Sequence, residues 1–154
     1  MPFDAGRIPG ALRSAYLDGR CAVLVGAGAS AGAGLPLWGG LLERMLAAGE
    51  AEHRIAPARA AQYRTLLQKP DKFLMVASGI KSDVGNLFDE IIEDIFVKSQ
   101  PQPTDLHRAL VELDRLRFIL TTNYDTLIED AFLATGKRVS VNTSVDAGDV
   151  HRRL

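Results

Sequence analysis

The stretch CAVLVGAGASAGAGLPLW, residues 21–38, joins a short apolar run to a segment built almost entirely from glycine and alanine. The run Cys21–Val25 has the length of a strand, which predicts a strand of a parallel sheet covered on both faces. Directly after it, Gly26–Ala31 fits the pattern G-x-G-x-x-A. Such glycines let backbone N–H groups approach a pyrophosphate, and the Ser30 hydroxyl adds a donor. The pattern predicts a phosphate-binding turn, and a turn that only packs against a neighbouring helix stays open as the alternative.

Length and composition are those of one globular domain. The chain has 154 residues, of which 47% are hydrophobic and 24% charged. Its 18 basic and 19 acidic residues give a net charge of -1 without a long run of one sign, so we expect no directly bound nucleic acid. The single cysteine, Cys21, excludes an internal disulfide and a cysteine-rich zinc site. No apolar run has the length of a signal peptide or membrane span, so we expect a cytoplasmic protein that does not contact a membrane. We also expect no bound metal.

Helical patterns flank the glycine segment. Residues 9–17 carry apolar side chains at helical spacing and are followed by the stop signal Gly19. A second helix is predicted to begin near Pro36, because proline suits a first helical turn. Its apolar stripe consists of Leu41, Leu42, Met45 and Leu46.

Residues 52–98 are predicted to form a helical insertion with breaks near Pro57, Pro70 and Gly79. The last segment of this insertion, residues 84–96, has apolar residues at the i, i+3, i+4, i+7 positions of a helix. Its acidic residues fall on the opposite side, where we expect them to be solvated.

After the linker QPQP, residues 100–103, one more helix is predicted before the sheet resumes. Thr104 has the residue type of an N-cap there. The apolar residues expected to face inward are Leu106, Leu110 and Leu113. The linker is too short for a domain boundary, so residues 1–154 are predicted to form one domain.

The stretch RFILTTNYDTLIEDAF, residues 117–132, repeats the order of strand, polar turn and helix. Phe118–Thr121 is the predicted strand, and Thr122 with Asp125 fits a capping-box pattern. The buried face of the following helix is predicted to be Leu127, Ile128, Ala131 and Phe132. A third strand, RVSVN, is predicted at residues 138–142.

Alternating strands and helices predict an α/β fold, a Rossmann-like three-layer arrangement with a mostly parallel sheet and a large helical insertion. Such sheets commonly have about five or six strands, whereas only three are visible in this sequence. We therefore expect the domain to be incomplete at its C-terminus.

The two polar turns are expected to share one site, because ligands of α/β folds bind beyond the carboxyl ends of the strands. Asn123 can hold a ribose hydroxyl or a water, and Asp125 can stabilise positive charge on a sugar ring during glycosidic cleavage. Helix capping is the alternative for both and is favoured for Asp125, whereas the predicted Thr122 cap leaves Asn123 without a structural role. A hydride-transferring oxidoreductase is disfavoured, because the ribose-binding carboxylate should end a strand, and Glu43 and Glu50 lie on a helical pattern.

Together, VLVGAGASAGAGLPLW and FILTTNYDTLIEDAF resemble the sirtuin-like (silent information regulator-type) NAD-hydrolase domains of bacterial antiviral defence systems, which are relatives of the NAD-dependent protein deacylases. The resemblance implies that the glycine loop binds NAD and that the complete enzyme cleaves the nicotinamide–ribose bond, which depletes NAD. The cofactor-binding residues it implies are Gly26, Ala27, Gly28, Ser30, Thr122 and Asn123. Asn123 is also implied to be catalytic, with Asp125 as a weaker addition.

Departures from the relatives narrow the function. Deacylases carry Phe-Arg after the loop's proline and usually a four-cysteine zinc ribbon, whereas this chain has Leu37, Trp38 and one cysteine, so protein deacylation is not expected. The family's catalytic histidine, followed by glycine, is absent from these residues. His53 is predicted to face solvent, His107 to be packed or capping, and His151 is a weak candidate for the base. Activity is therefore expected of the complete protein, and the activity of this fragment stays open.

Two other interpretations remain. The chain can be a module that senses NAD or ADP-ribose without cleaving it, or a helical interaction domain whose glycine loop is only structural. Besides NAD or ADP-ribose, we expect a homo-oligomer or a sensor partner or domain.

Overall fold

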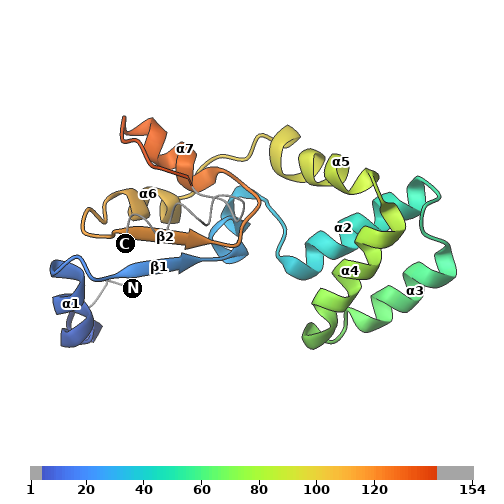
Figure 1. Ribbon diagram of the computed structural model, residues 1–154, viewed down its shortest axis with the longest axis horizontal. Helices are drawn as coiled ribbons and strands as arrows, with labels where there is room; N and C mark the ends of the chain where they lie inside the picture. Colours follow the sequence, from blue (N-terminus) through green and yellow to red (C-terminus); the bar gives the residue numbers. More distant parts are fainter. Residues whose placement is uncertain (1–4, 142–154) are drawn as a thin grey trace.

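The computed structural model of the protein describes residues 5–141. In chain order the elements are the 3-10 turn η1 (Ala5–Arg7), α1 (Gly10–Leu17), β1 (Ala22–Val25), the 3-10 turns η2 (Ala27–Ala29) and η3 (Ala31–Ala33), α2 (Trp38–Ala51), α3 (Pro57–Leu66), the 3-10 turn η4 (Pro70–Lys72), α4 (Phe73–Val84), α5 (Leu87–Glu93), the π-helical turn η5 (Asp94–Lys98), α6 (Asp105–Val111), β2 (Phe118–Thr121) and α7 (Leu127–Ala134). The fold is mixed α/β, mostly helical, with one small parallel sheet. Figure 1 shows two parts, the sheet with α1, α6 and α7, and a group formed by α2 to α5.

Both strands of the paired motifs are confirmed. β1 and β2 run parallel, with Ala22 opposite Phe118 and Val25 opposite Thr121. The helix predicted at residues 9–17 is confirmed as α1, and Gly19 follows it with a φ of +67° that favours glycine. The sequence therefore predicts correctly the elements that lead into the glycine loop.

The sheet is covered on one face only. Val25 is buried and Val23 and Ile119 are partly buried, and all three pack with side chains of α6 and α7. On the opposite face, the paired Leu24 and Leu120 are 70% and 56% exposed. The expectation that β1 is covered on both faces is thus wrong for the described residues, because no described helix covers the Leu24 side.

The third predicted strand is not formed in the described part of the chain. Residues 138–141 are irregular, Val139 and Val141 are exposed, and the sheet of the described residues consists of β1 and β2. Asn142, the last residue of the predicted strand, lies outside the described residues. The alternating valines satisfy the local pattern of a strand, but a strand also needs a neighbouring strand to accept its hydrogen bonds.

The helical group has a core of its own. The predicted stripe of α2 is confirmed, because its buried residues include Leu41, Leu42, Met45 and Leu46. The side chains of α2 pack with those of α3, α4 and α5 in this core. Leu127 of α7 and Leu35 of the loop before α2 belong to the same cluster, so the core extends to the edge of the sheet part.

The predicted breaks in the helical middle are partly correct. Pro57 begins α3 and Pro70 begins η4, as predicted. Gly79 lies inside α4 and does not break it. A Cβ atom at position 79 would lie 2.5 Å from the hydroxyl oxygen of Tyr63, so close packing requires the glycine. The chain breaks instead at Gly85, whose φ is +56°.

Residues 84–96 span more than one element, because α5 continues directly into the π-helical turn η5. The buried members of the apolar pattern are Val84, Ile91, Ile95 and Phe96. The acidic residues Asp89, Glu90, Glu93 and Asp94 are exposed. The predicted solvated acidic face is therefore confirmed.

The inward face of α6 differs from the prediction. Leu110 is buried as expected, but Leu106 and Leu113 are 51% and 40% exposed. The other buried residues of α6 are His107 and Val111. The buried face of α6 therefore runs through His107, Leu110 and Val111.

Candidate functional site

The register of the sheet brings the two polar turns to the same edge. Val25 and Thr121 are the last residues of β1 and β2 and lie opposite each other. The N–H of Thr122 donates to the carbonyl oxygen of Val25 at 3.3 Å, which extends the pairing by one step. The loop after Val25 and the turn after Thr121 therefore begin side by side, as expected for a site at the carboxyl ends of parallel strands.

The glycine loop consists of the two successive 3-10 turns η2 and η3. A Cβ atom at Gly26 or Gly28 would meet no other atom within 4 Å, so open space lies beside both residues. Ala27 and Gly28 begin η2, and in residues 5–141 their backbone N–H groups make no hydrogen bond. The loop closes at Gly34, whose φ of +82° favours glycine.

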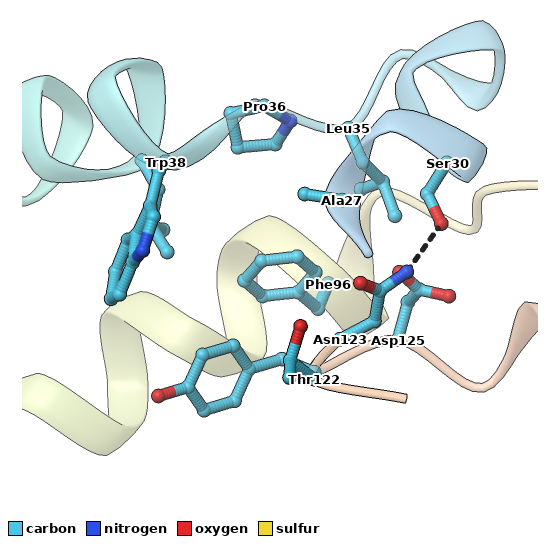
Figure 2. A pocket seen from close by; sticks show the side chains of 11 residues that line it. Ala27, Ser30, Leu35, Pro36, Trp38, Phe96, Thr122, Asn123 and Asp125 are labelled. Carbon is cyan, nitrogen blue, oxygen red and sulfur yellow. Dashed lines mark hydrogen bonds between the residues drawn. The ribbon is translucent and has the colours of Figure 1, made fainter. Parts of the chain in front are cut away.

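A pocket of about 160 Å³ is lined by residues of the sheet part and of the helical group. Figure 2 shows side chains from both polar turns, from the start of α2 and from η5 around it. Its lining residues are Ala27, Ser30, Leu35, Pro36, Trp38, Leu41, Phe96, Thr122, Asn123, Tyr124 and Asp125. Five of the residues singled out from the sequence, those at positions 27, 30, 122, 123 and 125, thus line one pocket, whereas Gly26 and Gly28 do not line it.

Asn123 connects the two turns. Its amide Nδ2 donates to Ser30 Oγ at 3.1 Å, which is the dashed line in Figure 2. Its Oδ1 is buried and has no hydrogen-bond partner in the described structure. Glu129 Oε2 is in the same situation there, but Glu129 does not line the pocket. A buried acceptor without a partner costs about 1–3 kcal/mol, so Asn123 carries a cost that a bound donor removes.

Ser30 and His107 form a buried polar pair behind Asn123. Both side chains are almost completely buried, and Ser30 Oγ lies 3.4 Å from His107 Nε2. The backbone N–H of Thr104 donates to His107 Nδ1 at 3.1 Å. Thr104 Oγ1 lies 2.8 Å from the same Nδ1, so the Thr104 hydroxyl proton has two acceptors, this nitrogen and the carbonyl oxygen of Ala29. With Nδ1 as an acceptor, the neutral imidazole carries its proton on Nε2, which then donates to Ser30. Ser30 Oγ therefore accepts from both Asn123 and His107 and keeps its own proton for a further acceptor.

Thr104 is confirmed as the N-cap of α6. Its hydroxyl donates to the carbonyl oxygen of Ala29 at 3.2 Å, so the cap also attaches the helix to the glycine loop.

Burial lowers the pKa of His107 below its usual 6.5, because burial penalises the charged ring, and the Asp125 carboxylate acts in the opposite direction. The expectation that His107 is packed and capping is confirmed.

The capping box predicted for Thr122 and Asp125 is wrong. The N-cap of α7 is Thr126, so a longer turn separates the strand from the helix. Asp125 Oδ1 accepts from the backbone N–H of Leu127 at 3.2 Å, which is a structural role of the kind favoured for it. Thr122 lines the pocket without capping the helix, and this frees its hydroxyl for other contacts.

Three aromatic residues of the pocket were not assigned to a site from the sequence. Trp38 begins α2, Phe96 belongs to η5, and Tyr124 lies in the turn after β2. The Phe96 and Tyr124 rings are 5.6 Å apart between centroids. Phe96 fits the apolar helical pattern and looks like an ordinary core residue. The one local signal was Tyr124, an aromatic residue between two polar site candidates.

The other ionisable candidates lie away from the pocket or outside the described residues. His53 is exposed in the turn after α2, as predicted. Glu43 and Glu50 both bind Arg64 of α3, at 2.7 Å and 2.6 Å, which holds the two helices together. His151 lies outside the described residues.

No protein-family model matches the chain, and no curated protein matches it closely enough to count as related. Within residues 5–141, no three histidine, cysteine, aspartate or glutamate residues lie together as metal ligands would. In the same range, every helix is too short or too polar to cross a membrane.

Proposed function

We propose that the chain is part of a Rossmann-like, sirtuin-like domain that binds NAD, and that the complete protein hydrolyses the bond between nicotinamide and ribose. In this proposal the enzyme is cytoplasmic, needs no metal and acts as a defence effector that depletes NAD. The pyrophosphate lies along the glycine loop, and the nicotinamide end enters the pocket beside Asn123.

The observation that carries the proposal is the unpartnered Asn123 Oδ1. Its amide nitrogen donates to Ser30, and its oxygen has no hydrogen-bond partner among the described residues. The oxygen is thus available to a donor from a ligand or a water. A ribose hydroxyl or a water is such a donor, and in hydrolysis the water supplies the attacking oxygen.

The glycine loop supports the position of the phosphates. The unused N–H groups of Ala27 and Gly28 and the open space at Gly26 and Gly28 suit a group that needs donors and room. Ser30 accepts two hydrogen bonds and does not use its own hydroxyl proton in them, so this hydroxyl is a third donor close by.

Hydrolysis requires a water oxygen to bond to the ribose carbon that carries nicotinamide. The carbon–nitrogen bond breaks, its electron pair moves to the pyridinium ring, and neutral nicotinamide leaves. A base removes a proton from the attacking water, and Asn123 orients that oxygen. His107 is a poor base, because its Nδ1 already accepts from Thr104 and its Nε2 proton points to Ser30. In this proposal the base is a histidine outside the described residues, either His151 or one in a longer form of the protein.

One observation favours the alternative function, a module that senses NAD or ADP-ribose without cleaving it. Among the described residues that line the pocket there is no histidine. A binding module needs the glycine loop and the pocket but no base, so it fits these residues without any addition.

Nicotinamide release and calorimetric binding of NAD distinguish the two functions. For the enzyme, Asn123→Ala should remove most of the release per folded molecule and leave NAD binding within about threefold, because the pyrophosphate is held elsewhere. Gln68→Ala removes an exposed amide side chain that does not line the pocket, so it is the control and should keep most of both. Release is measured in a form of the protein extended to include the expected histidine. NAD binding without release in that form supports the sensor, and absence of NAD binding contradicts both functions.

A further inference from the structure

The pocket has aromatic walls on the side away from the glycine loop. Trp38, Phe96 and Tyr124 line it from three separate elements, and Figure 2 shows Trp38 and Phe96 on the side of the helical group. Trp38 is 41% exposed and Tyr124 is 54% exposed, although both are large aromatic residues. Aromatic faces left open at a pocket are available to a ligand.

The charge of the pocket has one sign. Its lining contains one carboxylate, Asp125, and no lysine, arginine or histidine. The unpartnered Asn123 Oδ1 adds the negative end of an amide dipole. Lys81 lines an adjoining cavity, where its ammonium group is held over the Phe88 ring at 4.8 Å. The charged and polar groups that face the pocket therefore favour a cation.

The size of the pocket matches one aromatic ring. A volume of about 160 Å³ is close to the roughly 150 Å³ of an engineered protein cavity that binds benzene. Aromatic faces attract a cation placed within about 6 Å of the ring centre, and tryptophan does so most strongly. A flat, positively charged ring fits the volume of the pocket, can stack on its aromatic side chains and is attracted by the Asp125 carboxylate.

We propose that this pocket selects a positively charged aromatic ring, an N-alkylpyridinium, over neutral and anionic rings, with Trp38 and Tyr124 as the specificity-determining residues. The inference rests on the proposed function, in which the ring is the nicotinamide end of oxidised NAD. Cleavage removes the positive charge from that ring, so the pocket holds the neutral product more weakly than the substrate. The selection contributes to substrate affinity and to product release, and the rate of bond breaking depends on Asn123.

The test compares two rings that differ mainly in charge, 1-methylnicotinamide and nicotinamide, by calorimetric titration of the full 154-residue chain. We expect the cation to bind about tenfold more tightly, as one or two cation–π contacts and a carboxylate provide. Trp38→Leu should reduce the preference to about threefold or less, whereas Trp38→Phe keeps an aromatic face and should retain more of it. Tyr124→Leu repeats the test at a second exposed position, and thermal unfolding verifies that each variant is folded.

Asp125→Asn tests the carboxylate separately. Asparagine keeps an oxygen that can accept from Leu127, so the turn should persist while the preference for the cation falls. Equal binding of the two rings, no measurable binding of either, or an unchanged preference in folded Trp38→Leu and Tyr124→Leu would overturn the inference. NAD binding and cleavage are measured in parallel. If the cation is preferred but NAD does not bind, the proposed function fails alone; if NAD is cleaved but the rings bind equally, this inference fails alone.

Discussion

Ser30 determines how the site is held together. Its hydroxyl oxygen accepts from the Asn123 amide and from His107, so it joins the glycine loop to the second turn and to α6. The sequence identified Ser30 and Asn123 as site residues from their positions after two strands. It could not show their contact, because 93 positions separate them and the contact depends on the register of the sheet.

His107 should make the stability of the protein depend on pH. Burial lowers its folded-state pKa below the usual 6.5, so near that pH the unfolded chain binds a proton that the folded chain does not. The stabilising contribution is present above about pH 6.5 and is lost as the pH falls through the lower folded-state pKa. We expect the unfolding free energy to fall more between pH 8 and pH 5 in the unmodified protein than in His107→Gln.

Glutamine is a suitable control because it occurs naturally at this position of capping boxes and does not titrate. The measurement is urea unfolding at several pH values for both proteins. Parallel pH profiles of the two would show that the protonation of His107 has no influence on folding.

The elements are predicted better than their ends. The strands and the stripe of α2 follow from continuous apolar runs and helical spacing, which are local signals. The sequence predicts Thr122 as the N-cap of α7, whereas the helix begins at Leu127 with Thr126 as its N-cap. The sequence predicts a break at Gly79, whereas this glycine is needed inside α4 for its close contact with Tyr63 of α3. Both errors come from contacts that a short window of sequence does not contain.

The caps of α6 and α7 give an experimental check at this scale. Thr104→Ala should lower the unfolding free energy by about 1–2 kcal/mol, because it removes an N-cap hydroxyl that also binds Ala29. Thr122→Ala should cost less than about 0.5 kcal/mol, because Thr122 is exposed and caps no helix. Denaturant unfolding of both variants measures the difference, and a cost at Thr122 as large as at Thr104 would restore the predicted capping box.

For the whole molecule, the sequence predicts the mixed α/β class but not the extent of the sheet. β1 and β2 pair as expected, whereas Val139 and Val141 remain exposed without a strand partner in the described residues. The aromatic residues of the pocket could not be predicted from the sequence either, because they come together only when α2 and η5 pack near the turn after β2.

The exposed face of the sheet should promote self-association. Leu24 and Leu120 are adjacent across the two strands and together present an apolar surface. We expect Leu24→Lys and Leu120→Lys to raise the concentration at which the chain associates, as measured by sedimentation. Leu133→Lys, the same change at a position of α7 that is 71% exposed, is the control and should have less effect. Equal effects of all three variants would indicate a general influence of charge.

The central claim is that the glycine loop and the pocket beside it bind NAD, and calorimetric titration of NAD into the unmodified protein and Gly28→Val tests it most directly. A Cβ atom at Gly28 meets no protein atom within 4 Å, and its φ does not require glycine, so the variant should fold normally. The account predicts that the unmodified protein binds NAD and that Gly28→Val loses at least about tenfold in affinity, because its branched side chain fills the space of the phosphates. A folded Gly28→Val that binds NAD as tightly as the unmodified protein, or an unmodified protein that does not bind NAD, would contradict it.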